Sequence, residues 1–445
     1  MRIFSAAAPR LILFSALLPV YLSASLEVPG PEQKQPVALV GGTVHPVSGE
    51  PIARGTVLFE KGKITAVGAE VKVPADAIVV DVKGLHVYPG LIEPFSNLGL
   101  IEIGSIRATV DDQEIGKINP EVRAEKAINP DSERFPVTRA NGVALAAVLP
   151  SGGLISGLGA VVRLDGWTWD QMTVKAPLCL LVNWPDMSPP GRGLDKEARE
   201  KRARQLKEDL AALEQAFKDA RAYKQARAAA GAKGVPAHDL DVRWEALLPV
   251  LSGEVPVWVT AERRMEIEAA VDWAQREGLK MVLAGGAEAA ECAGLLKANN
   301  IPVIAAPVLS LPLRRDSDYD EPFTLPDKLF RAGVEFCIGG RASMNGNERN
   351  LPYNAAMAAA FGLPKEEALK AITLYAAKIL GIADRAGSLE AGKEATIMVT
   401  DGDPLEVTTQ VEKLYIQGRP VDLDTRQKAL YRKYREKYRR LGRGE

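Results

Sequence analysis

Several charged side chains of this 445-residue chain follow apolar segments, where they could carry out acid–base chemistry. Glu93 and Glu262 are the two catalytic candidates, because two carboxyl groups can serve as acid and base when their surroundings separate their pKa values. A second interpretation, which we favour, is that the charges here pair with one another and fill a pocket, because structural ion pairs are common. The polar residues that could hold a ligand beside the two glutamates are Asn97, Arg263, Arg341, Asn345 and Glu348.

The chain has few of the side chains that usually hold transition metals. Its histidines are His45, His86 and His238, and none of them ends a long apolar segment. Its cysteines are Cys179, Cys292 and Cys337. They form no CxxC pair, so no thiolate zinc site is indicated. We expect them to be small buried residues, and one disulfide between two of them stays open in an oxidising compartment.

The overall composition is that of an ordinary globular protein, with 47% hydrophobic and 25% charged residues and a formal net charge of -1. No basic excess favours a nucleic-acid partner. The first 25 residues contain Arg2 and Arg10, an apolar run over 11–22 and small residues at 23–25, which is typical of a signal peptide. The run is too short for a stable membrane span, so we expect a periplasmic or secreted protein.

The elements that must position the candidate side chains follow a repeating pattern after residue 90. Apolar strands alternate with helical stretches, which indicates a parallel sheet buried on both faces. The length of this region, 87–386, favours a TIM-like (β/α)8 barrel over an open sheet. The predicted strands are 143–149, 176–182, 255–261, 280–284, 301–305 and 334–338, and the predicted helices are 265–277, 289–299, 327–332 and 365–380.

Short β-rich segments flank the barrel region on both sides. We expect residues 26–86 and 387–423 to fold together into one discontinuous β-sandwich domain. The fold class is therefore α/β, a barrel with a small composite sandwich.

Three further segments interrupt this pattern. The charged segment 195–245 predicts a helical arm on the outside of the barrel. Residues 424–445 predict a basic helix on which Tyr431, Tyr434, Tyr438 and Leu441 share one face, which we interpret as a packing face. The glycine-rich segment 152–159 has neither a phosphate-loop ending nor a G-x-S-x-G motif, so we expect a barrel-top loop there.

Motifs at both ends of the barrel region carry a resemblance to a known family. GGTV at 41–44, GKITAVG at 62–68 and VYPGLI at 87–92 resemble the entry into the barrel of amidohydrolase-superfamily enzymes, and GSLEAGKEAT at 387–396 resembles their return into the sandwich. RANGV at 139–143 and DGWTW at 165–169 are similar to the imidazolonepropionase-like exported subgroup. The resemblance implies a distorted barrel with one or two divalent metals at its strand ends, where a metal-bound hydroxide attacks an amide or ester.

The residues that should hold the metal according to this resemblance are absent. The His-x-His pair of the family falls on Phe95 and Asn97, its next histidine on Thr260, and its catalytic aspartate on Gly339. Phenylalanine and glycine side chains cannot ligate a metal, and an asparagine carbonyl suits harder cations better than zinc. We therefore predict no cofactor in this chain, where the family would use zinc or another divalent metal.

Three functions fit this pattern. The first is a degenerate amidohydrolase without the metal centre that binds a small molecule or a related barrel protein. The second is an active hydrolase of C–N bonds that uses Glu93 or Glu262 at a metal-free carboxylate site. The third is a structural subunit of a homo- or hetero-oligomer, for which the helical arm and the basic tail would be docking surfaces. None of the three involves nucleic acid or a stable membrane span.

Overall fold

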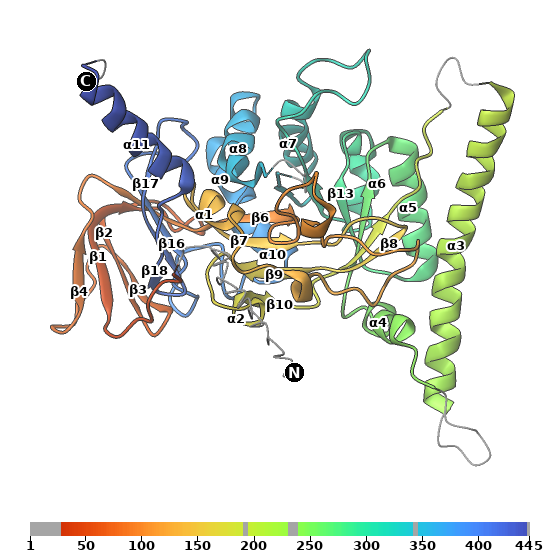
Figure 1. Cartoon of the computed structure of the whole chain (residues 1–445), viewed down its shortest axis with the longest axis horizontal. Helices are drawn as coiled ribbons and strands as arrows, with labels where there is room; N and C mark the ends of the chain where they lie inside the picture. Colours follow the sequence, from red (N-terminus) through yellow and green to blue (C-terminus); the bar gives the residue numbers. More distant parts are fainter. Residues whose placement is uncertain (1–27, 190–194, 230–238, 341–345, 443–445) are drawn as a thin grey trace, which may run out of the picture.

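The computed structural model describes residues 28–189, 195–229, 239–340 and 346–442. The expected signal peptide lies outside these ranges, as do His238, Arg341 and Asn345. Figure 1 shows a composite β-sheet at one end of the molecule, an α/β barrel in the middle and the long helix α3 at the other end.

The composite sheet joins segments from both ends of the chain. Its strands follow the order β18-β17-β16-β5-β1-β2-β3, with β4 beside β1. The pairing of β5 with β16 joins the two segments, so the sheet extends to Pro89, past the expected boundary at 86. One apolar cluster contains side chains from most of these strands, so the N- and C-terminal segments share a single core. The strands are β1 (Val37–Val44), β2 (Ile52–Glu60), β3 (Lys63–Gly68), β4 (Ile78–Asp81), β5 (His86–Pro89), β16 (Ile397–Thr400), β17 (Val411–Ile416) and β18 (Arg419–Pro420).

The barrel contains parallel strands in two groups. The first group pairs β6 with β7, and in the second group β11, β12, β13, β14 and β15 each lie parallel to the next. Antiparallel strands fill the space between the groups: β9 lies beside β7, and β8 lies beside β11. The (β/α)8 pattern is therefore distorted on this side. The strands are β6 (Leu91–Ser96), β7 (Val143–Val148), β8 (Ile155–Leu158), β9 (Ala160–Arg163), β10 (Thr173–Lys175), β11 (Leu180–Asn183), β12 (Val257–Ala261), β13 (Met281–Gly285), β14 (Val303–Ala305) and β15 (Phe336–Ile338).

Strand β8 corrects the expectation of a barrel-top loop over 152–159. Ile155 is fully buried, and the segment pairs with β11. A Cβ at Gly159 would lie 2.4 Å from Cδ2 of Leu149, so this glycine permits close packing. The glycines of this segment therefore mark close packing at a strand.

Alternate side chains of the barrel strands enter two different apolar clusters. On β12, Trp258 belongs to the inner cluster, whereas Val257 and Val259 belong to the outer one that the helices cover. Val282, Ile304 and Cys337 occupy the inner positions of the next three strands. This period of two is the geometry of a barrel strand, and it fills the interior with side chains.

Helices surround the barrel strands (Figure 1). The predicted helix over 365–380 is divided into α9 and α10, and the one over 289–299 into a 3-10 turn at Ala289–Cys292 followed by α6. No described helix is both long and apolar enough to cross a bilayer. The helices around the barrel are α1 (Arg134–Arg139), α2 (Trp169–Met172), α4 (Val242–Leu251), α5 (Arg264–Glu277), α6 (Ala293–Ala298), α7 (Glu321–Ala332), α8 (Leu351–Ala360), α9 (Lys365–Ala371) and α10 (Leu374–Ile379).

The two charged segments form long helices with different surroundings. The arm is one helix, α3 (Lys196–Ala229), and its Phe217 packs edge-on against Trp273 of α5 with ring centroids 5.2 Å apart. The C-terminal helix α11 (Arg426–Arg440) has no buried residue. Its tyrosines pack against nothing in the described part of the chain, so their interpretation as a packing face stays a prediction. The cysteines are buried, as expected, and all three are free.

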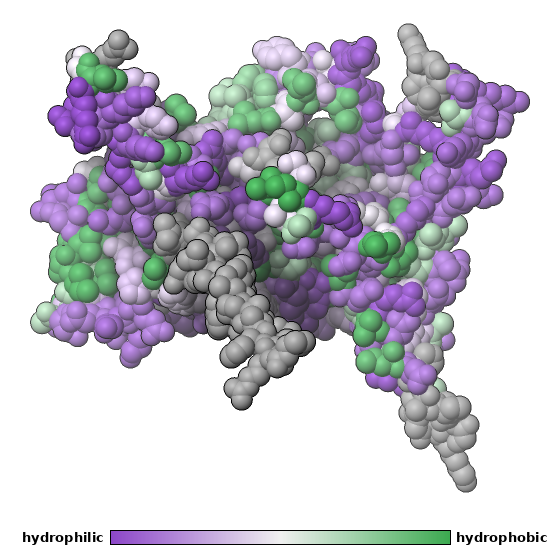
Figure 2. Space-filling view, in the orientation of Figure 1, coloured by the Kyte–Doolittle hydropathy of each residue, from purple (hydrophilic) through white to green (hydrophobic). Residues whose placement is uncertain are grey.

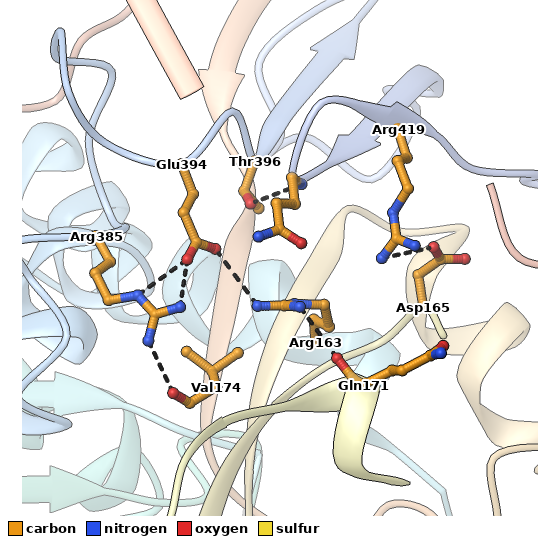
Figure 3. Close-up of polar contacts among 9 residues, drawn as sticks. Arg163, Asp165, Gln171, Val174, Arg385, Glu394, Thr396 and Arg419 are labelled. Atoms are coloured by element: carbon orange, nitrogen blue, oxygen red, sulfur yellow. Dashed lines mark hydrogen bonds and ion pairs between the residues drawn. The ribbon is translucent and has the colours of Figure 1, made fainter. Parts of the chain in front are cut away.

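A network of buried charges joins the composite sheet to the barrel (Figure 3). Nε of Arg385 donates to Oε1 of Glu394 at 2.9 Å, and Arg163 of β9 lies 3.9 Å from the other oxygen of the same carboxylate. Beside this cluster, Asp165 lies 3.6 Å from Arg419 of β18 and 3.7 Å from Arg139 of α1. The RANGV, DGWTW and GSLEAGKEAT motifs thus each contribute a charge to the contact between the two parts.

We expect Glu394→Ala to lower the free energy of unfolding by about 3 kcal/mol, because it leaves the buried Arg163 without its carboxylate partner. Glu406→Ala is the control in the C-terminal segment of the composite sheet. Glu406 pairs with Lys365 at the surface, where both side chains are more than half exposed, and its loss should cost less than about 1 kcal/mol. Denaturant unfolding of the two variants measures the difference, and equal losses would contradict the role assigned to the network.

Candidate functional site

The carboxylate of Glu93 links the first barrel strand to the segment that follows the last one. The N–H of Gly340 donates to both carboxylate oxygens at 2.9 Å, and the N–H of Phe95 donates to Oε1 at 3.1 Å. A Cβ at Gly340 would lie 2.8 Å from Oε2 of Glu93, and one at Gly339 would lie 3.1 Å from Oε1. The glutamate therefore occupies the space into which a side chain at either position would project.

Glu93 has a second carboxyl group as a neighbour. Glu348 is almost fully buried, and neither of its oxygens has a hydrogen-bond partner among the described residues. Burial raises the pKa of Glu93 to about 8, against the hydrogen bonds from Gly340 and Phe95, and the charge of Glu348 raises it further. Burial also raises the pKa of Glu348, which Arg134 partly offsets. The structure thus brings two of the predicted residues together as a buried pair of carboxyl groups, in which Glu93 is mostly protonated at pH 7.

Phe95 and Asn97 do not form a ligand pair. Phe95 packs in the inner apolar cluster of the barrel with Trp258 and Ile304. Asn97 is buried, and its Oδ1 has no hydrogen-bond partner among the described residues. One neutral oxygen beside a phenyl ring does not provide the nitrogen or charged ligands that zinc requires.

Thr260 belongs to a polar cluster that the sequence did not indicate. Its hydroxyl donates to Oδ1 of Asn183 at 3.0 Å, and Nδ2 of Asn183 donates to Oγ of Ser156 at 2.8 Å. Asn183 is the last residue of β11, and a polar residue at the end of an apolar strand is the one feature of the sequence that could have pointed to it. Ser156 lies on β8, within the segment for which the sequence predicts a loop.

Glu262 lines a cavity of about 180 Å³ at the carboxyl ends of β12, β13 and β14. Its Oε2 accepts a hydrogen bond from the N–H of Ala287 at 3.1 Å. Glu321, at the start of α7, lines the same cavity, and its Oε2 is buried without a hydrogen-bond partner among the described residues. The other walls are mostly apolar, including Ala306, Val308 and Leu325. The cavity is smaller than the pockets that usually hold drug-sized ligands, so it suits a more compact molecule.

The other predicted charges pair locally and lie outside this cavity. Arg263 precedes α5, and its N–H donates to Glu266 at 3.1 Å. Glu288 accepts a hydrogen bond from the N–H of Arg264 at 2.8 Å and pairs with Arg314 at 2.6 Å. Glu288 and Arg314 thus form an ion pair, whereas Glu262 and Glu93 accept hydrogen bonds from backbone N–H groups, so the interpretation that these charges pair with one another stays a prediction.

His45 and His86 lie in the composite sheet, away from the barrel strand ends. Nε2 of His45 is 3.0 Å from Nδ1 of His86, and its ring stacks on Tyr88. Burial, together with His86, lowers the pKa of His45 to about 4, so this ring is neutral at pH 7. A hollow of about 380 Å³ beside His45 is larger than the barrel cavity, but its other walls come from the loop over 47–51 and from α9 and α10 rather than from barrel strand ends. We therefore place the candidate site at Glu262 instead.

The residues at the strand ends do not fit the family's metal centre. No group of three or more His, Cys, Asp or Glu side chains in the described ranges could hold a metal ion. The predicted ligand positions carry Phe95, Asn97, Thr260 and Gly339. The space at Gly339 and Gly340 is taken by the carboxylate of Glu93. No catalytic step through a metal follows from this donor set.

Comparisons with known proteins find amidohydrolases, in agreement with the observed barrel and composite sheet. Residues 324–421 match the sequence model of the Amidohydrolase family. Amidohydrolase tasK of Hapsidospora irregularis is 23% identical over 401 residues, which cover 82% of this chain and 39% of that protein. The chain thus spans well under half of that relative's length.

Two solved structures show the same architecture. An amidohydrolase from Thermotoga maritima has a TM-score of 0.77 and 26% identity, and the match covers 87% of this chain and 99% of that one. An adenosine deaminase from Xanthomonas campestris with bound zinc has a TM-score of 0.52 and 18% identity, covering 92% of this chain and 100% of that one. The second likeness concerns the fold alone.

Replacing Glu93 should change how stability depends on pH. Because the folded state raises the pKa of Glu93 from 4.5 to about 8, it holds a proton that the unfolded chain has released between these values. The contribution of Glu93 to stability is thus present below the unfolded pKa and is lost as pH rises, at up to about 1.4 kcal/mol per pH unit. Glu93→Gln should remove this slope, as measured by denaturant unfolding between pH 5 and 8. The exposed Glu412→Gln is the control, and a slope unchanged by Glu93→Gln would contradict the assignment.

Proposed function

We propose that the chain is a non-catalytic member of the amidohydrolase superfamily that binds a small molecule; the match of residues 324–421 to the family model and the likeness to the Thermotoga maritima amidohydrolase support this assignment. The observation that carries this proposal is the filling of the catalytic end of the barrel: the carboxylate of Glu93 occupies the space where a side chain at Gly339 or Gly340 would lie. The other ligand positions hold an apolar ring, a lone amide and a hydroxyl committed to Asn183. We further infer membership of the exported imidazolonepropionase-like subgroup, which the RANGV and DGWTW motifs support.

The ligand site that we propose is the cavity at Glu262. It lies at the carboxyl ends of parallel barrel strands, where proteins of this architecture bind their ligands. Two carboxylate side chains face an otherwise apolar wall, so the matching ligand is a small molecule with an amine or amide N–H and an apolar body. Cyclic imides and dipeptides have this chemistry.

Metal analysis and ligand binding together test the proposal. The purified mature protein, incubated with zinc and then desalted, should retain far less than one metal ion per chain. Calorimetric titration with cyclic imides and dipeptides should reveal a ligand whose affinity falls about tenfold or more in Glu262→Gln, because a charge-assisted hydrogen bond is lost. Glu268→Gln, which removes a surface carboxylate outside the cavity, should bind as the unchanged protein does. Stoichiometric zinc, manganese or iron would overturn the loss of the metal centre.

The second candidate function is a metal-free hydrolase of C–N bonds, favoured by the position of Glu262 on the cavity wall. A carboxylate there could act as a general base toward a water molecule that attacks a bound amide. Screening cyclic imides, dipeptides and lactones should then reveal hydrolysis that Glu262→Gln reduces at least about a hundredfold. Activity that is indifferent to Glu262→Gln and Glu93→Gln would remove both residues from any catalytic role.

A further inference from the structure

Helix α11 presents an apolar face that nothing in the described chain covers. Five large side chains of this helix and its C-terminal cap are between 41% and 64% exposed: Leu430, Tyr431, Tyr434, Tyr438 and Leu441. At 3.6 residues per turn they fall on a continuous arc of about 100°. Figure 1 shows the helix projecting from the composite sheet. In Figure 2 it is mostly hydrophilic, with hydrophobic atoms near its tip.

The basic residues of α11 divide into two sets according to the face that they occupy. Arg439 and Arg440 pair with Glu436, and Arg432 pairs with Asp424; these three arginines lie at least about 130° from the middle of the apolar arc. The cations that border the arc form no ion pair within the described ranges. They are Arg426, Arg435 and Lys437, each within about 40° of an edge of the arc. The uncompensated positive charge is therefore concentrated on both sides of the apolar face.

We propose that α11 is a docking helix that lies on an anionic lipid bilayer. An amphipathic helix with an apolar face and bordering Lys and Arg residues rests in the plane of the membrane interface, where its cations meet the lipid phosphates. Tyrosine suits this depth, because its ring is apolar and its hydroxyl stays near water. The absence of any buried residue on α11 means that docking requires no rearrangement of the barrel or the composite sheet.

The distribution of charge on α11 favours a lipid bilayer as its partner over a second copy of the helix or a nucleic-acid duplex. In a pairing of two copies of α11, the like charges that border the two apolar faces would oppose each other. A nucleic-acid duplex would satisfy the cations but would offer no apolar phase to Leu430 and Leu441. Only a surface that is both anionic and apolar underneath satisfies both features of the helix.

Co-sedimentation of the full mature chain with vesicles tests the inference. We expect binding to vesicles of phosphatidylcholine mixed with phosphatidylglycerol, no binding to vesicles of phosphatidylcholine alone, and weakening of the binding by salt. The double variant Arg435→Gln/Lys437→Gln should lower the affinity about tenfold or more, because each cation near an anionic bilayer contributes to binding. Its matched control, Arg432→Gln/Arg439→Gln, removes the same charge from the opposite face and should stay within about threefold.

The apolar arc is tested separately through fluorescence and substitution. Tyr438→Trp should show a blue shift on mixing with the anionic vesicles, and Tyr434→Ser/Tyr438→Ser should release the protein from them, with thermal unfolding unchanged in both variants. No binding to anionic vesicles, or equal losses in the two charge variants, would overturn the proposal. So would tight binding of an oligonucleotide, or a dimer in sedimentation velocity that Tyr434→Ser/Tyr438→Ser dissociates.

Discussion

The bond between Glu93 and the backbone of Gly340 is the interaction on which the barrel depends. No strand ladder joins β15 to β6 in the described ranges, so the ring closes through this carboxylate and through the N–H of Ile92, which donates to the carbonyl of Ile372. A buried carboxyl group with two backbone donors is fixed in position, because leaving those groups unpaired would be costly. At this join, the space beside Gly339 and Gly340 thus holds a structural side chain.

A second set of charges fixes the composite sheet against the barrel. Arg163 and Glu394 meet there with little exposure, together with the partly exposed Arg385 and beside Asp165 with its own two arginines. Since a buried charge is tolerated only with its partners, the network restricts how the two parts can be oriented. Three of the motifs that carry the family resemblance, RANGV, DGWTW and GSLEAGKEAT, supply charged residues of this contact.

Much of the fold could be predicted from the sequence, because apolar strands alternate with helices and the composite segments repeat short β patterns. The assignment of Phe95, Thr260 and Gly339 to ligand positions rests on the family resemblance and stays a prediction. The antiparallel strand β8 was missed because its glycines mark close packing, which a linear pattern cannot distinguish from flexibility. The cluster of Thr260, Asn183 and Ser156 was missed because three separate segments contribute to it. The tyrosines of α11 share a face as predicted, but periodicity alone does not say what covers a face.

The contact between Glu93 and two glycines also limits which substitutions this part of the barrel can accept. A side chain at Gly340 would begin 2.8 Å from the carboxylate, so an acidic residue could not be introduced there while Glu93 stays in place. Removing Glu93 first would open the join between the first and last strands. An acid at position 340 would therefore need concerted changes, and each single change would give a less stable protein. Packing thus makes this part of the barrel resistant to stepwise substitution.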